Sequence, residues 1–291
     1  MKNIILGIVA LLLIGGGIYF LMNQTPDTVV IVDENAEMMP VEPDGGIGDG
    51  APPLNEVIAQ QRGPESVIGT SVDGTEIMAF HFGTGANEVL FVGGTHGSDA
   101  PSTMKVAEEL VAYLESNPSV IPANVAVTII PNLNPDGATK SGAAGRFNAN
   151  NVDLNRNFDC EWSATGVWRN QEVSGGSKPF SEPEAQALKQ YVDTYNPSAA
   201  VVWFASEGKV YPSACAGTPS DQSVTLAATF ANAAGYGVEA EFDAYAITGD
   251  MVNWMAKQDI PAISVLLTGR DNTEWTKNKA GIEAVLNSYA N

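Results

Sequence analysis

Histidine and cysteine are scarce in this sequence of 291 residues, which contains only two of each. A zinc site in a protein takes three or four side-chain ligands from His, Cys, Asp and Glu. Neither Cys160 nor Cys215 has a second cysteine or a histidine close by in the sequence, so their spacing excludes them as zinc ligands. Any zinc site must therefore depend on histidine and carboxylate ligands. Whether the chain supplies enough of these ligands decides between a metal-dependent function and another one.

Basic residues are also few. The 14 Lys and Arg stand against 34 Asp and Glu, which gives a formal net charge of −20 at pH 7. Nucleic acids and anionic lipids attract basic surfaces, so this balance argues against either as a partner of the folded part. We expect an acidic, solubilising surface and no nucleic-acid binding.

The longest apolar run lies near the N-terminus, at residues 4–22. Its length of about 19 residues is enough to cross a bilayer at roughly 1.5 Å per residue. We predict that residues 1–23 form a membrane anchor with the rest exported, or else a signal segment whose removal gives a secreted protein. Residues 24–58 carry only acidic charges, which predicts a disordered linker. A folded domain is expected over residues 59–291.

Short apolar runs alternate with helix-like patterns in this domain, which predicts an α/β fold whose sheet has helices on both faces. Strands are expected at residues 89–93, 125–130, 199–204 and 262–267, and helices at residues 102–116 and 274–289. A further helix is expected to begin with Ser181 as its N-cap, followed by Pro183 and Glu184.

Two sequence motifs carry residues typical of a catalytic or binding site. In the first, His96 and Asp99 lie three residues apart on the loop after an apolar run, like half of a zinc site. In the second, Arg146 and Arg156 lie ten positions apart, with Asn155 beside the second arginine. A guanidinium group offers a planar pair of donors that matches a carboxylate, so the two arginines can converge on one anion.

These motifs, with the segment Asn132-Leu133-Asn134-Pro135-Asp136-Gly137, resemble those of the zinc metallocarboxypeptidase family of the carboxypeptidase A/B type. The resemblance covers roughly residues 60–290. It implies a mixed parallel and antiparallel twisted sheet, bound zinc, and peptides with a free C-terminus as partners. It also implies individual roles: His96 and Asp99 bind the metal, Arg146 polarises the scissile carbonyl, Asn155 and Arg156 hold the terminal carboxylate, Tyr245 closes over it, and Val252 lies in the pocket for the terminal side chain.

Two positions depart from the family pattern. The resemblance places a second zinc histidine at position 205 and a general-base glutamate at position 266, where this chain has Ala205 and Leu266. His96 and Asp99 alone leave two protein ligands where a catalytic zinc has three, so zinc is expected to bind weakly or not at all. Glu207 is the candidate replacement ligand, although it lies about 6.5–7 Å further along an extended strand. His81 is expected to be a surface or packed residue.

The two cysteines suit an exported domain, since export permits a disulfide and an even count leaves no unpaired thiol. We predict a Cys160–Cys215 disulfide, with two buried free thiols as the alternative.

Two functions remain compatible with the sequence. The first is a catalytically impaired carboxypeptidase-like domain, tethered to the membrane outside the cytoplasm, that binds peptide C-termini. The second is an active metallocarboxypeptidase with a remodelled zinc site, acting on peptides or cell-wall peptides.

Overall fold

The structure, a computed structural model, describes residues 62–290. The predicted membrane segment (residues 1–23) and acidic linker (residues 24–58) lie outside the described residues. Among the helices of residues 62–290, none combines the length and the apolar character needed to span a membrane.

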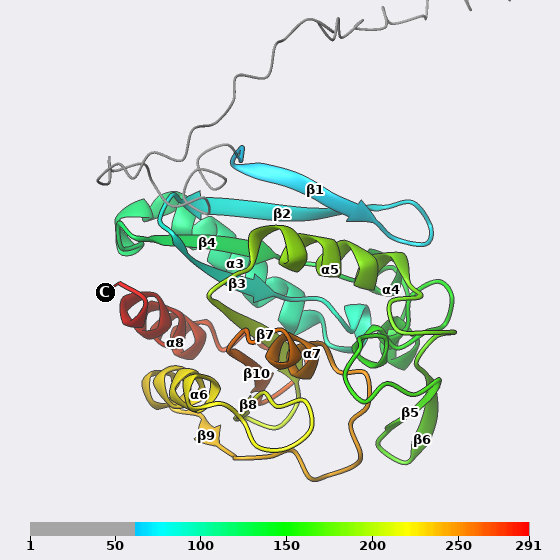
Figure 1. Ribbon diagram of the computed structural model, residues 1–291. Coiled ribbons are helices and arrows are strands. Elements are labelled where there is room, and N and C mark those ends of the chain that lie inside the picture. The colour runs from blue at the N-terminus through cyan, green and yellow to red at the C-terminus, as the bar shows by residue number, and fades with distance from the viewer. Residues whose placement is uncertain (1–61, 291) are drawn as a thin grey trace, which may run out of the picture. The chain divides into compact units, whose positions relative to one another are not determined.

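A mixed sheet of eight strands forms the centre of the domain (Figure 1). In spatial order the strands are β1 (Glu65–Thr70), β2 (Glu76–Gly83), β4 (Val125–Ile130), β3 (Asn87–Val92), β7 (Ala199–Ala205), β10 (Ala262–Leu267), β8 (Lys209–Pro212) and β9 (Gly237–Val238). The four central strands β4, β3, β7 and β10 run parallel, whereas β1 and β2 pair antiparallel with their neighbours. At the other edge β8 is antiparallel to β10 and parallel to β9. The expected mixed sheet is confirmed.

Helices cover both faces of this sheet, as predicted. One face packs against α3 (Pro101–Ser116), α6 (Asp221–Ala234) and α8 (Trp275–Ser288), and the other against α5 (Pro183–Tyr195) and α7 (Met251–Lys257). Successive side chains of a strand point to opposite faces, so Trp203 of β7 joins the first cluster and Val202 the second. Burial on both faces explains why the central strands are mostly apolar rather than alternating between apolar and polar residues.

Shorter elements surround the carboxyl ends of the parallel strands. They are η1 (Gly97–Asp99), α4 (Pro135–Ala138), η3 (Gly142–Arg146), η4 (Leu154–Arg156) and the two-stranded sheet of β5 (Thr165–Trp168) and β6 (Gln171–Ser174). One more short helix, η2 (Pro118–Val120), lies at the opposite end of the sheet, just before β4 begins. Both sequence motifs lie in this layer of short elements, on η1, η3 and η4 and the turns beside them.

The predicted N-cap of α5 is wrong. Glu182 occupies the cap position, and its side chain makes no capping hydrogen bond. The Ser181 hydroxyl instead accepts a hydrogen bond from Asn157 Nδ2 at 2.9 Å and donates one to Glu182. Glu184 accepts from the backbone of Val72 at 3.2 Å rather than from its own helix. Partners distant in the sequence have replaced the local cap.

Candidate functional site

A cavity of about 470 Å³ opens at the carboxyl ends of the central strands. The loop after β3, the ends of β7 and β10, η4 and the segment before α7 all contribute to its wall. The sequence-predicted residues among its lining are His96, Arg146, Asn155, Arg156, Tyr245, Ala205 and Leu266. The fold therefore gathers residues from five separate stretches of the chain around one space.

His96 lies in the turn that joins β3 to η1. Its ring packs against Phe204 with centroids 5.5 Å apart, and the residue is only 6% exposed. Nδ1 lies 3.3 Å from Nη1 of Arg146, and Nε2 lies 3.5 Å from Oδ1 of Asp153. A guanidinium group can only donate, so Nδ1 accepts and the ring proton resides on Nε2. At 3.5 Å the Nε2 contact is too long for a normal hydrogen bond, so its attraction to Asp153 is electrostatic.

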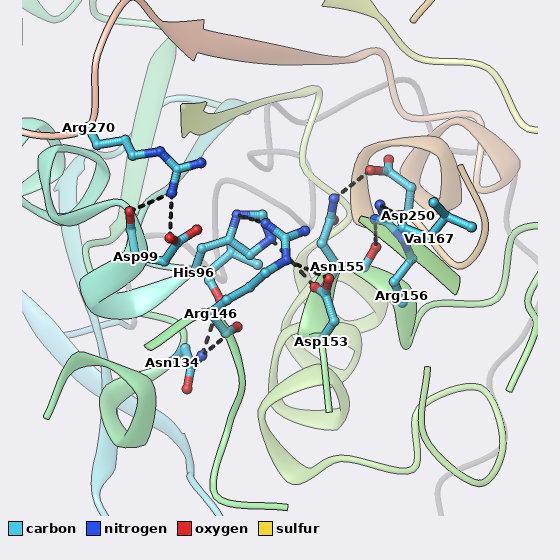
Figure 2. A network of polar contacts seen from close by, with 11 residues as sticks. His96, Asp99, Asn134, Arg146, Asp153, Asn155, Arg156, Val167, Asp250 and Arg270 are labelled. Atoms are coloured by element: carbon cyan, nitrogen blue, oxygen red, sulfur yellow. Dashed lines mark hydrogen bonds and ion pairs between the residues drawn. The ribbon is translucent and has the colours of Figure 1, made fainter. Parts of the chain in front are cut away.

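Asp153 and Arg146 form a buried ion pair beside this histidine (Figure 2). Arg146 Nε donates to Oδ2 of Asp153 at 2.8 Å, and Oδ1 accepts from the backbone N–H of Asn155 at 3.1 Å. The other side of the Arg146 guanidinium group lies against Trp168, 4.6 Å from the ring centroid. Arg146 is thus fixed by a carboxylate and an aromatic face, and its Nη1 contacts His96.

The charges of this group follow from burial and proximity. Burial, followed by the positive charge of Arg146, lowers the pKa of His96 to about 4. Burial alone would raise the pKa of Asp153, but the adjacent Arg146 holds it well below its usual range. Near neutral pH the group therefore comprises a neutral imidazole, a carboxylate and a guanidinium ion.

Asp99, the second predicted metal ligand, forms an ion pair with Arg270, which lies in the loop after β10. Arg270 Nη1 contacts the Asp99 carboxylate and also donates to its backbone carbonyl at 3.0 Å. Asp99 is buried, and it does not line the cavity. Asp99 thus lies on the same short turn as His96, with its carboxylate against Arg270.

Asn155 and Arg156 lie on η4 and face the cavity. Asn155 donates from Nδ2 to Asp250 at 2.7 Å and accepts the backbone N–H of Met251 at 3.1 Å, which links η4 to the start of α7. Arg156 is 1% exposed, and its two terminal nitrogens donate to the carbonyls of Asn155 and Val167 at 2.7 and 2.8 Å. Its Nε has no partner among the described residues.

Tyr245 belongs to an aromatic wall of the cavity. Its ring lies 5.9 Å from the Arg156 guanidinium carbon and 4.9 Å from the ring of Phe242, which in turn lies 5.6 Å from Tyr211. The three rings continue from Arg156 along one side of the cavity, so a ligand held by this arginine would extend along an aromatic surface.

Val252 does not line this cavity, contrary to expectation. It is 1% exposed within α7 and packs in the core on the side of α5. Asp250, the N-cap residue of α7, and Asn253 line the cavity instead. The helical turn directs position 252 towards the sheet, which spacing along the sequence could not show.

The two altered family positions, Ala205 and Leu266, lie at the carboxyl ends of neighbouring strands. Ala205 ends β7, Leu266 is the penultimate residue of β10, and both line the cavity near His96. Glu207 does not line it. Its carboxylate accepts a hydrogen bond from Tyr211 at 2.9 Å and lies 3.5 Å from the ammonium group of Lys209. The structure therefore gives Glu207 partners on β8 instead of placing it beside His96.

Comparison with known proteins identifies the family to which this chain belongs. The sequence profile described as zinc carboxypeptidase matches residues 61–285, which is most of the chain. The chain belongs to the zinc carboxypeptidase family.

Several characterised relatives of this zinc carboxypeptidase domain share part of its length. Murein peptide amidase A of Escherichia coli K12 is 33% identical over 119 residues, which cover 38% of this chain and 45% of that protein. An inactive metallocarboxypeptidase of Ajellomyces capsulatus is 31% identical over 150 residues, 43% of this chain and 25% of that protein. These matches span less than half the length of either relative.

Solved structures share the fold across most of the chain. Murein-tripeptide amidase from Escherichia coli O157 aligns with a TM-score of 0.60 at 22% identity, covering 79% of this chain and 92% of that one. Carboxypeptidase A from Helicoverpa armigera aligns with a TM-score of 0.65 at 17% identity, covering 78% and 68%. At these identities the likeness establishes the zinc carboxypeptidase fold alone.

The donor groups present do not fit the zinc ion that this family uses. Residues 62–290 contain no group of three or more His, Cys, Asp and Glu side chains placed to hold a metal. Of the two predicted ligands, His96 directs Nδ1 at a guanidinium nitrogen and Asp99 is paired with Arg270. A catalytic zinc needs three protein ligands, and the position of the third carries a methyl group at Ala205.

The predicted Cys160–Cys215 disulfide is confirmed, with 5.7 Å between the Cα atoms. It joins the chain just after η4 to the segment after β8. Both segments line the cavity through neighbouring residues, Glu161 on one side and Ala214 on the other. The alternative of two free thiols is wrong, and the bond ties two walls of the cavity together.

The sequence analysis missed several residues of the site, among them Asp153, Trp168, Asp250 and Arg270. Asp153 lies two positions before Asn155 in the second motif, so its place in that motif was an available signal. Trp168, Asp250 and Arg270 lie outside both motifs and reach the site through β5, α7 and the loop after β10. Only their tertiary contacts reveal them.

Proposed function

We propose that this zinc carboxypeptidase-like domain binds peptides through their free C-terminal carboxylate and does not hydrolyse them. Arg156 carries the proposal. Its guanidinium group is buried, lines the cavity, and forms no ion pair with an acidic side chain of residues 62–290. Its bonds to two backbone carbonyls fix its orientation but leave it without a direct carboxylate partner, and Nε remains unpartnered. The Asp153 and Asp250 carboxylates interact with its charge without forming an ion pair with it. A carboxylate is the planar anion that matches a guanidinium group best.

Arg146 has a different part in this proposal. It is already paired with Asp153, so it contributes positive potential and one remaining nitrogen rather than a free charge. The aromatic wall formed by Tyr245, Phe242 and Tyr211 lies along the path that a peptide held at Arg156 would follow. We assign the primary carboxylate contact to Arg156, with Asn155 and Tyr245 beside it.

Impaired catalysis follows from the groups at the other end of the cavity. Leu266 offers no proton acceptor, and positioned acid–base groups typically contribute about 10²–10⁴-fold to a rate. The missing third ligand at Ala205 compounds this loss. A relative named as an inactive metallocarboxypeptidase shows that loss of activity occurs in this family. Another relative is named a murein peptide amidase, which makes cell-wall peptides a candidate ligand class.

We also propose that residues 1–23 tether the domain to a membrane, with the domain outside the cytoplasm. The apolar run at residues 4–22 supports a tether, and the disulfide supports an oxidising compartment. Expression of the full chain in bacteria tests this proposal. We expect the chain in the membrane fraction and sensitive to protease added to spheroplasts. A protease-resistant chain, or one released into the medium after cleavage, would contradict the tether.

Calorimetry with a matched pair of peptides tests the binding function. The probe is an alanine-terminated cell-wall stem tetrapeptide, as the free acid and as the C-terminal amide, titrated into the full chain with EDTA present. We expect the acid to bind with a Kd of roughly micromolar to millimolar, and the amide at least tenfold more weakly.

Matched variants and a cleavage assay complete this test. Arg156→Met should weaken binding of the acid at least tenfold. The control Arg169→Met removes an exposed guanidinium group from the turn between β5 and β6 and should leave binding unchanged. Equal binding of acid and amide would refute the proposal. Mass spectrometry of the peptide after incubation with zinc should show no loss of the terminal residue. Its release would support the alternative, an active metallocarboxypeptidase with a remodelled site.

A further inference from the structure

The loop after β10 is fixed to the start of α3 by several hydrogen bonds. The backbone carbonyl of Arg270 accepts from the N–H of Ser102 at 3.0 Å, and that of Gly269 accepts from the Ser102 hydroxyl at 3.2 Å. The Arg270 side chain then donates to the backbone carbonyl of Asp99 at 3.0 Å and contacts its carboxylate. Arg270 is therefore held in one orientation, with its positive charge directed at Asp99.

Asp99 needs such a partner because its side chain is only 7% exposed. A buried carboxylate is costly unless a cation or several donors compensate it. The other candidate ligand on the same turn also has an arginine as its partner, because Nδ1 of His96 accepts from Arg146. Figure 2 shows the result, in which Arg270, Asp99, His96, Arg146 and Asp153 follow one another across the site. Each group with a lone pair for a metal faces an arginine.

We propose that Arg270 serves as a built-in cation that neutralises Asp99 and excludes a divalent metal from the His96–Asp99 pair. A metal at this pair would have to displace Arg270 from the carboxylate and Arg146 from the imidazole, and would then lie close to two positive charges. In a domain that had only lost a zinc ligand, the remaining ligand groups would still be free to bind a metal, whereas here arginines occupy them. Restoring a histidine at position 205 does not restore a metal site while Arg270 remains.

The proposal concerns metal exclusion, whereas the function proposed above concerns peptide binding. The two are tested by different measurements, and either can fail while the other holds. Peptide calorimetry in EDTA does not depend on Arg270, and metal titration without peptide does not depend on Arg156.

Metal titration of the full chain, purified in detergent, tests the proposal. Zinc affinity is measured by competition with a chromophoric chelator, and cobalt substitution reports coordination through its visible absorption. The variants are A205H, A205H/R270Q and A205H/R270K. Glutamine keeps a donor for Asp99 but removes the charge, whereas lysine keeps the charge. We expect A205H/R270Q to bind zinc at least tenfold more tightly than A205H, and A205H/R270K to bind like A205H.

A matched control separates this local effect from a change in net charge. A205H/K257Q removes one cation from an exposed ion pair with Asp159 and should bind zinc like A205H. A205H/R270M is a second neutral variant, and the comparison uses whichever neutral variant keeps the unfolding midpoint of A205H. Equal affinity of A205H and the neutral variant, including no measurable binding by either, would overturn the proposal. So would stoichiometric zinc in the unchanged chain that disappears on His96→Ala.

Discussion

Replacing Asp153 with asparagine tests how the site is held together. Asp153 is 0% exposed, and its carboxylate accepts from Arg146 Nε at 2.8 Å and from the Asn155 backbone at 3.1 Å. Asparagine has nearly the same shape and can still accept one of these hydrogen bonds. The substitution therefore removes the charge with little change in packing, and leaves the buried guanidinium group of Arg146 without a counter-ion.

The expected loss is large. Removing one partner of a buried ion pair costs about 3–5 kcal/mol, because the remaining charge stays buried without compensation. For a domain of this size, about 2–4 °C in unfolding midpoint corresponds to 1 kcal/mol. We therefore expect Asp153→Asn to lower the midpoint by roughly 6–20 °C.

Differential scanning calorimetry and urea unfolding of the full chain measure this loss. The control is Asp159→Asn, which breaks an exposed ion pair with Lys257. The Asp159 side chain is 49% exposed and the Lys257 side chain 45% exposed. An exposed pair contributes at most about 1 kcal/mol. The double variant Arg146→Met/Asp153→Asn removes both charges and should recover part of the stability lost in Asp153→Asn.

A loss below about 1 kcal/mol in Asp153→Asn would refute this reasoning, because it would mean that the Arg146 charge is compensated without Asp153. The absence of any recovery in the double variant would refute it as well. In that case the loss would come from hydrogen bonding and backbone geometry rather than from the unpaired charge.

Two further predictions concern stability. Replacing both cysteines with serine should lower the free energy of unfolding by about 2–4 kcal/mol, because the Cys160–Cys215 bond closes a loop with a sequence separation of 55. Urea unfolding measures this loss, and an unchanged unfolding midpoint would contradict it. Burial, then the charge of Arg62, lowers the pKa of His81 from 6.5 to about 4, so its contribution to stability is complete above about pH 6.5 and declines as pH falls towards 4. The unfolding midpoint of His81→Gln should fall less steeply than that of the unchanged chain over this range, and parallel profiles would contradict the assignment.

Much of the fold could be predicted from local patterns. The strands at residues 125–130 and 262–267 have the predicted bounds, because their apolar side chains are buried on both faces of the sheet. The helix-like pattern at residues 102–116 also located α3. The N-cap of α5 could not be predicted, because Asn157 and Val72, distant in the sequence, bond Ser181 and Glu184.

The candidate site divides in the same way. The two motifs named His96, Arg146, Asn155 and Arg156, and the fold places all four around one cavity. Val252 was misplaced because spacing does not determine which side of a short helix faces a cavity. The roles proposed for these residues remain predictions that the binding and metal experiments test.

The sequence by itself determined the family, the mixed α/β sheet and the two altered positions, because each depends on residue type and order along the chain. It also showed that neither of the two histidines stands at position 205, where the family resemblance places the second zinc histidine. Only the tertiary structure decided what compensates the remaining ligand groups. Arg270 reaches Asp99 from the end of a strand far along the chain, and Arg146 reaches His96 from η3. The charge balance of a buried site is a sum over neighbours in space, and the order of residues along the chain does not contain that sum.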